Sequence, residues 1–176
     1  ITPETEPELT EAIIISNRKR GQQDDSAHGI IHRALTAIRL KDIEEAMQNM
    51  TQLFNHGFVR RTLQTSHFPY RGVFPDLTGA VPAFLVEMSV FSMPGIVEFL
   101  PTMPDYLMQG SIDGVWLYTM AKLEHMEWNE HGAKAVLTSG KAQTLTLRCR
   151  RKGARILVGG TELPMDGDAA THSFRE

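Results

Sequence analysis

Through residues 8 to 93, apolar side chains recur mainly with the spacing of an amphipathic α-helix. A first helix is predicted over the segment ELTEAIIISNRKRG, with Thr10 near its start and Gly21 beyond its end. A second helix follows Asp25 or Ser26, either of which can cap its free N–H groups. The apolar face of this second helix consists of Ile30, Ala34, Leu35 and Ile38.

A third helix is predicted to begin after Asp42, because Glu45 stands three residues later, as in a capping box. Gly57 is the expected end of this helix. Only a short turn separates it from the second helix, so the two are expected to lie antiparallel as an α-hairpin. The predicted apolar stripe of the third helix consists of Ile43, Met47, Met50 and Phe54.

Helical periodicity stops in the segment RRTLQTSHFPYRGVFP, residues 60 to 75. This segment is rich in Pro, Gly and polar residues and is predicted to be a long irregular loop, which in a compact domain is either functional or disordered. A fourth helix is then expected from about Thr78 to Phe91, ended by the segment SMPG. Pro82 is expected in its first turn, where a missing N–H costs little.

From residue 111 to residue 163 the pattern is that of short β-strands. The predicted strands are GVWLYT, KLEHMEW, KAVLTS, QTLTLRC and RILVGG. In QTLTLRC, Leu145, Leu147 and Cys149 point to one side and the polar residues to the other, which predicts a half-buried antiparallel strand. The C-terminal segment MDGDAATHSFRE is expected to be frayed.

These patterns together predict an α+β protein in two parts. Residues 1–95 form a helical segment, residues 96–110 form a junction rich in Pro and Gly, and residues 111–176 form a small β-domain. A chain of 176 residues is long enough to bury a hydrophobic core in such a domain or pair of domains.

Composition narrows the class of function. Hydrophobic residues make up 41% of the chain and charged residues 22%, as in ordinary globular proteins. The net charge of -3 gives no reason to expect nucleic acid as a partner. One basic cluster, RCRRKGAR at 148–155, is interpreted as a solvated strand end and turn, with a phosphate or polyanion site as the alternative. Because Cys149 is the single cysteine, an internal disulfide and a Cys-based zinc site are excluded.

No apolar run approaches the roughly 20 residues that cross a bilayer, so no membrane partner is predicted. The N-terminal stretch ITPETEPELTEA has no starting Met and does not have the pattern of a signal peptide. We therefore expect a soluble chain without a targeting segment, in a compartment that the sequence does not specify. We also expect that it begins part-way through a longer product.

Several residues invite a chemical interpretation that the pattern does not support. His28 and His32 are four residues apart, but Gly29 stands where a zincin has Glu, and no third ligand is evident, so no metal or other cofactor is predicted. Ser66 and Ser139 do not lie in a strand–turn–helix elbow, so a serine hydrolase is not predicted.

Two further groups have a structural and a functional interpretation. Trp116, Tyr118 and Trp128 are suited to stack on sugars, although aromatic residues on short strands usually belong to the core. Asp76 stands at the start of the fourth helix, where it is either a cap or a carboxylate held ready for chemistry. The helix N-terminus favours its charged form, which suits a base and not a proton donor.

The order of motifs in the chain resembles the C-terminal part of glycoside hydrolase family 95, which includes inverting α-L-fucosidases and related α-L-galactosidases. The matching segments are DLTGAVPAFLVEM, PGIVEFLPTMPDYLMQGSIDGVW, MEWNEHGAKAVLTS and the helix pair ALTAIRLKDIEEAM. Asp76, Glu87 and Met88 fall at the spacing of the family's motif, and Thr78 and Gly79 stand where the family has Asn and Phe.

The resemblance implies the closing helices of an (α/α)6 barrel, followed by a small antiparallel β-sandwich-like domain. It also implies that Asp76 is the general base of an inverting hydrolysis, whose acid lies upstream in the same enzyme. His67, Tyr70 and Arg71 are candidates for sugar contacts. The expected function is that of a C-terminal portion of a glycoside hydrolase acting on a terminal α-linked, fucose- or galactose-like sugar, incomplete and inactive alone. Its expected partners are a carbohydrate substrate and the upstream remainder of the enzyme.

The alternative function is that of a non-catalytic structural or carbohydrate-binding module built around Trp116 and Trp128. In that case Asp76 would only cap a helix.

Overall fold

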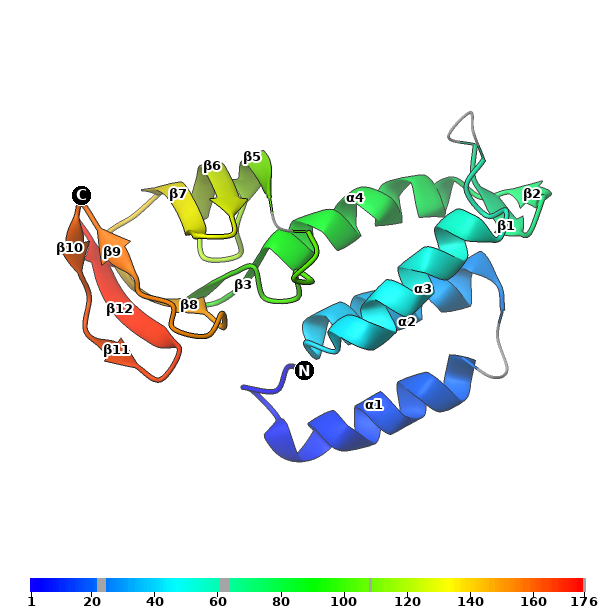
Figure 1. Ribbon diagram of the computed structural model, residues 1–176, viewed down its shortest axis with the longest axis horizontal. Coiled ribbons are helices and arrows are strands. Elements are labelled where there is room, and N and C mark those ends of the chain that lie inside the picture. Colours follow the sequence, from blue (N-terminus) through cyan, green and yellow to red (C-terminus); the bar gives the residue numbers. More distant parts are fainter. Residues whose placement is uncertain (22–24, 61–63, 108, 176) are drawn as a thin grey trace. The chain divides into compact units, whose positions relative to one another are not determined.

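The computed structural model describes residues 1–21, 25–60, 64–107 and 109–175, and the chain divides into two compact units, Ile1–Glu87 and Met88–Glu176 (Figure 1). Over these residues the fold is α+β, as predicted, with helices in the first unit and several small sheets in the second. The described residues form no helical barrel. None of the helices among them is both long enough and apolar enough to cross a membrane.

The first three helices are those that the sequence predicts. They are α1 (Pro7–Gly21), α2 (Ala27–Arg39) and α3 (Ile43–Asn55). Ser26 caps α2, since its hydroxyl accepts a hydrogen bond from the third helical N–H at 3.1 Å, and Asp42 caps α3 through the N–H of Glu45 at 3.2 Å. The local capping chemistry therefore fixes where both helices begin.

Helices α2 and α3 are antiparallel, as predicted, because only residues 40–42 connect them and a buried polar contact joins their middles. Arg33, near the middle of α2, donates from Nε to Oδ1 of Asn49 on α3 at 3.0 Å, and both residues are buried. Asn17 of α1 donates to the backbone oxygen of Arg33 at 3.1 Å and is buried as well. One polar cluster thus joins all three helices.

The predicted apolar stripe of α3 is wrong at its two ends. Ile43 and Phe54 are exposed. The face that packs inward is rotated and consists of Ala46, Asn49, Met50 and Leu53. The rotation brings Asn49 to Arg33, and a buried charged group needs such a partner. Apolar spacing alone could not show this requirement.

Part of the segment expected to be irregular is a β-hairpin. Strand β1 (Ser66–Phe68) pairs antiparallel with β2 (Arg71–Val73), while residues 61–63 of the expected loop lie outside the described residues. Thr65 joins this hairpin to the next helix, because its hydroxyl donates to the backbone oxygen of Phe74 at 2.6 Å and lies 3.0 Å from the hydroxyl of Thr78. The hairpin and the start of the fourth helix are therefore one local structure.

Helix α4 (Pro75–Ser89) begins and ends slightly before the predicted range. Pro75 is its first residue, where the missing N–H costs nothing, whereas Pro82 lies in the interior and not in the first turn as expected. Three fully buried side chains follow one face of the helix, and they are Leu77, Phe84 and Met88. This burial outweighs the backbone hydrogen bond that Pro82 cannot donate.

The second unit begins with strands where the sequence suggested a helix end and a junction. β3 (Val90–Met93) and β4 (Ile96–Phe99) form an antiparallel hairpin, and Gly95 supplies the positive φ of 81° at its turn. Val97 is fully buried in this hairpin. The boundary between the two units lies between Glu87 and Met88 in the chain, upstream of the junction expected at 96–110, of which residue 108 is not described.

The hairpin belongs to a five-stranded sheet with the order β11-β12-β8-β4-β3. In β8 (Gln143–Cys149) the predicted alternation is confirmed, because Leu145 and Leu147 are buried and Thr144 is exposed. β8 pairs antiparallel with β12 (Ala169–Phe174) but parallel with β4, so the sheet is mixed and not purely antiparallel. The expected frayed end is wrong, since β11 (Met165–Asp166) and β12 complete this sheet.

A second sheet of the same unit has the order β5-β6-β7, and its strands are β5 (Gly110–Trp116), β6 (Ala121–Asn129) and β7 (Gly132–Ser139). A register shift between Leu123 and His125 marks a β-bulge in β6. The short strands β9 (Leu157–Val158) and β10 (Thr161–Glu162) form a hairpin before β11.

Candidate functional site

Asp76 is the second residue of α4 and its side chain is exposed. Its carboxylate has no hydrogen-bond or ion-pair partner among the described residues, so it is not the helix cap that the structural interpretation required. Asp76 is therefore available to a water molecule or a ligand.

His67 lies beside the start of α4 because the hairpin is joined to that helix. Its ring contacts Phe68 with centroids 4.5 Å apart and Phe74 with centroids 4.9 Å apart, both edge to face. Its Nδ1 is buried and has no hydrogen-bond partner in the described part of the chain. His67 is thus held by packing, with one polar atom unsatisfied.

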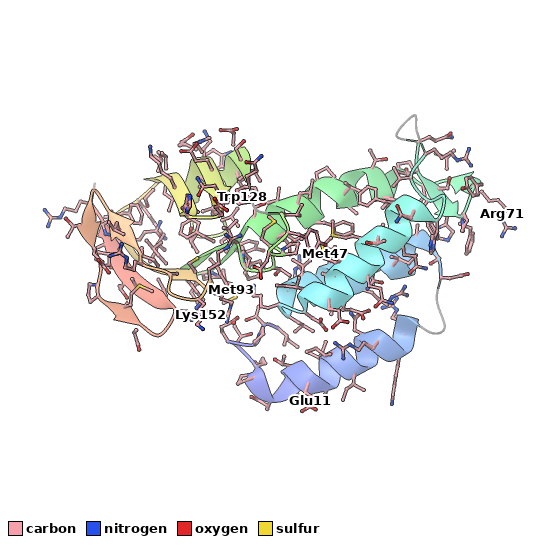
Figure 2. The ribbon with its side chains drawn as sticks, in the orientation of Figure 1. Glu11, Met47, Arg71, Met93, Trp128 and Lys152 are labelled. Atoms are coloured by element: carbon pink, nitrogen blue, oxygen red, sulfur yellow. The ribbon has the colours of Figure 1, made fainter. Side chains whose placement is uncertain are left out.

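Tyr70 and Arg71, at the turn of the hairpin, are exposed. The backbone N–H of Tyr70 donates to the oxygen of Gly57 at 3.0 Å, and a Cβ on Gly57 would lie 2.5 Å from the Tyr70 ring. Arg71 lies 5.9 Å from the ring centroid of Phe68 and, in Figure 2, points outward from the end of the hairpin. The four predicted site residues therefore share one hairpin–helix structure, with Tyr70 resting on the end of α3.

The structure shows one ion pair, with two hydrogen bonds, that the sequence analysis did not predict. Arg39 donates to both carboxylate oxygens of Glu87, at 2.8 and 2.7 Å, and so joins the end of α2 to α4. Glu87 belongs to the motif that also contains Asp76, and Arg39 belongs to the motif of the helix pair. Arg and Glu at motif positions were a signal that could have suggested this pair.

His28 and His32 are both exposed on α2 and stack on each other, with ring centroids 4.8 Å apart and an interplanar angle of 22°. His28 also contacts Phe74, at 5.8 Å between centroids. Within the described residues, no group of three or more His, Cys, Asp or Glu side chains is placed to hold a metal ion.

Two of the three aromatic residues considered for sugar stacking do not belong to the core. Trp116 is 76% exposed and Tyr118 is 81% exposed, so the core interpretation is wrong for both. Lys122 lies 5.8 Å from the ring centroid of Trp116. The backbone N–H of Tyr118 donates to the hydroxyl of Ser92 at 2.9 Å, which fixes the chain at this turn.

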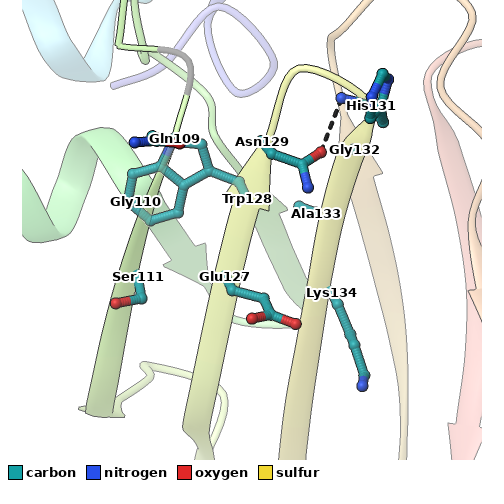
Figure 3. A pocket seen from close by; sticks show the side chains of 10 residues that line it. All are labelled: Gln109, Gly110, Ser111, Glu127, Trp128, Asn129, His131, Gly132, Ala133 and Lys134. Carbon is teal, nitrogen blue, oxygen red and sulfur yellow. Dashed lines mark hydrogen bonds between the residues drawn. The ribbon is translucent and has the colours of Figure 1, made fainter.

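The third aromatic residue, Trp128, lines a cavity of about 680 Å³ near the turn between β6 and β7 (Figure 3). Its indole lies over Gly110, where a Cβ would come within 2.6 Å of Cη2, and its Nε1 donates to the backbone oxygen of Leu107 at 3.2 Å. The other side chains around the cavity are mostly polar and include Glu127 and Lys134. A half-buried indole among polar groups can stack on a sugar ring.

Neither this cavity nor a second one in the same unit is lined by Asp76, His67, Tyr70 or Arg71. Comparison with models of known protein families and with curated proteins finds no match for this chain. The resemblance to glycoside hydrolase family 95 therefore rests on the motifs of the chain itself.

Proposed function

We propose that the chain is the C-terminal portion of an inverting glycoside hydrolase of the family-95 type, in which Asp76 is the general base. The observation that carries this proposal is the exposed carboxylate of Asp76 in the first turn of α4, which has no partner among the described residues. N–H groups at a helix N-terminus stabilise negative charge, and a base must be negatively charged to accept a proton.

In the proposed reaction, Asp76 accepts a proton from a water molecule as the water oxygen attacks the anomeric carbon. The bond between that carbon and the leaving-group oxygen breaks, and an acid elsewhere in the intact enzyme protonates the departing oxygen. The two carboxyl groups of an inverting pair lie about 6.5–9.5 Å apart, which leaves room for the water. The substrate is a terminal α-linked sugar, and the helices of the first unit correspond to the closing helices of an (α/α)6 barrel.

Two features of the first unit support this proposal. The pair Arg39–Glu87 joins two of the segments on which the resemblance rests, so these two motifs contact each other in the folded chain. The contact between Thr65 and Thr78 holds the hairpin against the first turn of α4, although Thr78 replaces the Asn of the family. His67, Tyr70 and Arg71 are on this hairpin, and we assign them to sugar contacts.

The test uses the intact enzyme that contains this chain, with a chromogenic α-L-fucoside and an α-L-galactoside as substrates. Asp76→Asn should lower kcat by about two orders of magnitude or more, which is the usual contribution of acid–base catalysis. The matched control is Asp105→Asn, which changes an exposed Asp outside the proposed site and should leave kcat unchanged. NMR of the first product formed should show the inverted anomer. Unchanged turnover in Asp76→Asn, or retention of configuration, would contradict the proposal.

A second candidate function is carbohydrate binding without catalysis, and the exposure of Trp116 and Tyr118 favours it. Exposed aromatic rings stack on the apolar faces of sugars, and Lys122 beside Trp116 can donate hydrogen bonds to hydroxyl groups. Trp128 in its polar cavity would provide a separate contact.

This second function is tested on the 176-residue chain alone, by affinity electrophoresis in gels that contain a panel of polysaccharides. Trp116→Ala should raise the Kd that the retardation gives by about tenfold or more, whereas Asp76→Asn should leave that Kd unchanged. Equal mobility of Trp116→Ala and the wild-type chain in every gel would rule out binding through this residue.

A further inference from the structure

The second unit contains a cavity of about 720 Å³ that neither proposed function uses. Its walls come from β7, from the face of the five-stranded sheet that carries Phe99 and Leu147, and from the segment 151–159. That segment consists of most of the connection between β8 and β9, β9 itself and Gly159, and Lys152 marks it in Figure 2. The cavity volume is within the range of about 300–1,000 Å³ that is typical of small-molecule sites.

Cations outnumber carboxylates among the lining residues. Arg151, Lys152 and Arg155 all line the cavity, against the carboxylate of Glu130 as the single one among the described residues. Arg155 also lies 3.4 Å from Glu162, so its charge is partly compensated. These residues belong to the basic cluster at 148–155, for which the sequence left a phosphate site open as the alternative to a solvated turn.

Arg151 points to a ligand more specifically than the net charge does. Its Nη2 is buried and has no hydrogen-bond partner among the described residues. A buried guanidinium nitrogen without an acceptor is costly, and an anion that accepts its hydrogen bond removes this cost. By contrast, Arg148 and Arg150, on the other side of the strand end, are both paired with Asp168.

The remaining walls of the cavity are largely apolar. Phe99, Leu137, Leu147 and Ile156 line it, and Ile156 and Leu147 are buried. Two imidazoles, of His131 and His172, also lie in the wall. A free inorganic anion would leave the apolar surface wet, whereas a ligand with an apolar body would cover it.

We propose that this cavity binds a small organic anion with an apolar body, and that Arg151 pairs with its carboxylate, sulfonate or phosphate group. The site is independent of Asp76 and of the aromatic residues Trp116 and Tyr118. It is therefore expected to bind its ligand whether or not the chain is part of a glycosidase.

The test uses a matched pair of fluorescent probes with similar aromatic bodies. Anilinonaphthalene sulfonate carries an anionic group, and N-phenyl-naphthylamine is neutral. The chain should bind the sulfonate saturably with one site per molecule, and Arg151→Gln should raise the Kd for it about tenfold or more, because a hydrogen bond to a charged group is lost. The Kd for the neutral probe should be higher than that for the sulfonate and should not change in Arg151→Gln.

Two further variants keep the test decisive. Lys141→Gln removes an exposed cation of the same unit that does not line the cavity, and it should leave both Kd values unchanged. Ala135→Trp adds bulk to the wall and should abolish binding of both probes. Circular dichroism spectra must match the wild type for each variant, because partly unfolded chains bind the sulfonate non-specifically.

Three outcomes would overturn the proposal. They are absence of saturable sulfonate binding, equal affinity for the two probes, and an unchanged Kd for the sulfonate in a folded Arg151→Gln or Ala135→Trp variant.

Discussion

The buried contact between Arg33 and Asn49 allows a quantitative test of how the helices of the first unit are held together. Asn49→Ala removes the acceptor of the Arg33 Nε–H and two donor contacts from Nδ2 to Glu45, one to its backbone oxygen at 2.7 Å and one to its carboxylate at 2.9 Å. Arg33 is 2% exposed and Asn49 is 3% exposed, so water cannot readily replace the lost partner.

The expected magnitude follows from two opposing effects. A hydrogen bond to a charged group contributes about 1.5–3 kcal/mol, and loss of the buried acceptor removes it. Alanine has a higher helix propensity than asparagine, which returns up to about 0.7 kcal/mol within α3. The free energy of unfolding of the first unit should therefore fall by about 2 kcal/mol. The surface pair of Arg18 and Asp42, at 2.8 Å, should contribute no more than about 1 kcal/mol, so Arg18→Gln is the control.

The assay is urea unfolding, followed by two signals that report on different units. All helices in the described part of the chain lie within residues 7–89, so circular dichroism at 222 nm mainly reports the first unit. Both tryptophans, Trp116 and Trp128, lie in the second unit, so their fluorescence reports that unit. With an m-value of about 2 kcal/mol/M, a loss of 2 kcal/mol lowers the dichroism midpoint by about 1 M.

A double-mutant cycle with Arg33→Met isolates the contact itself. Methionine keeps the length and apolar stem of arginine but removes its charge, so the double variant has no buried cation at position 33. The coupling energy between positions 33 and 49 should be at least about 1.5 kcal/mol. Additivity within about 0.5 kcal/mol, or an Asn49→Ala effect no larger than that of Arg18→Gln, would refute the reasoning.

Two other predictions concern the sheet β5-β6-β7. The first uses a Trp116→Phe background, in which Trp128 is the remaining tryptophan. There, Gly110→Ala should displace the Trp128 indole, destabilise the second unit by about 1–3 kcal/mol and shift the tryptophan emission to longer wavelength. An unshifted emission spectrum would contradict this prediction. The hydrogen bond from Lys122 at 2.5 Å lowers the pKa of Glu124, so this carboxylate contributes stability at pH values above its unfolded-state pKa and loses it as the pH falls through the folded-state pKa. NMR titration should show that Lys122→Gln raises the pKa of Glu124. An identical Glu124 titration in the wild type and the variant would contradict the assigned role of Lys122.

Much of the local structure could be predicted from the sequence because short-range chemistry determines it. Ser26 and Asp42 cap their helices through N–H groups three residues away, and that geometry needs no distant partner. The alternation in β8 identified its buried side correctly, because successive side chains of a strand point to opposite faces of the sheet.

The candidate site was predicted only in part, because much of it depends on contacts between residues that are distant in the sequence. Position at a helix start was enough to single out Asp76, but its lack of a capping role depends on where its side chain lies in the folded chain. The hairpin at 66–73 was not predicted. Thr65 holds it in place through contacts to Phe74 and Thr78, which lie 9 and 13 positions away in the sequence. The cavity beside Arg151 could not be predicted, since its walls come from strands far apart in the sequence.

The sequence by itself determined the starts of α2 and α3, the change from helical to strand periodicity, and the two faces of the central strand β8. Only the tertiary structure decided which face of α3 is buried, that the C-terminal residues complete a sheet, and that β4 runs parallel to β8. The physical reason is that strand pairing and buried polar contacts are made between distant residues. Each such residue gains stability only when its partner is in place, and the local sequence does not specify that partner.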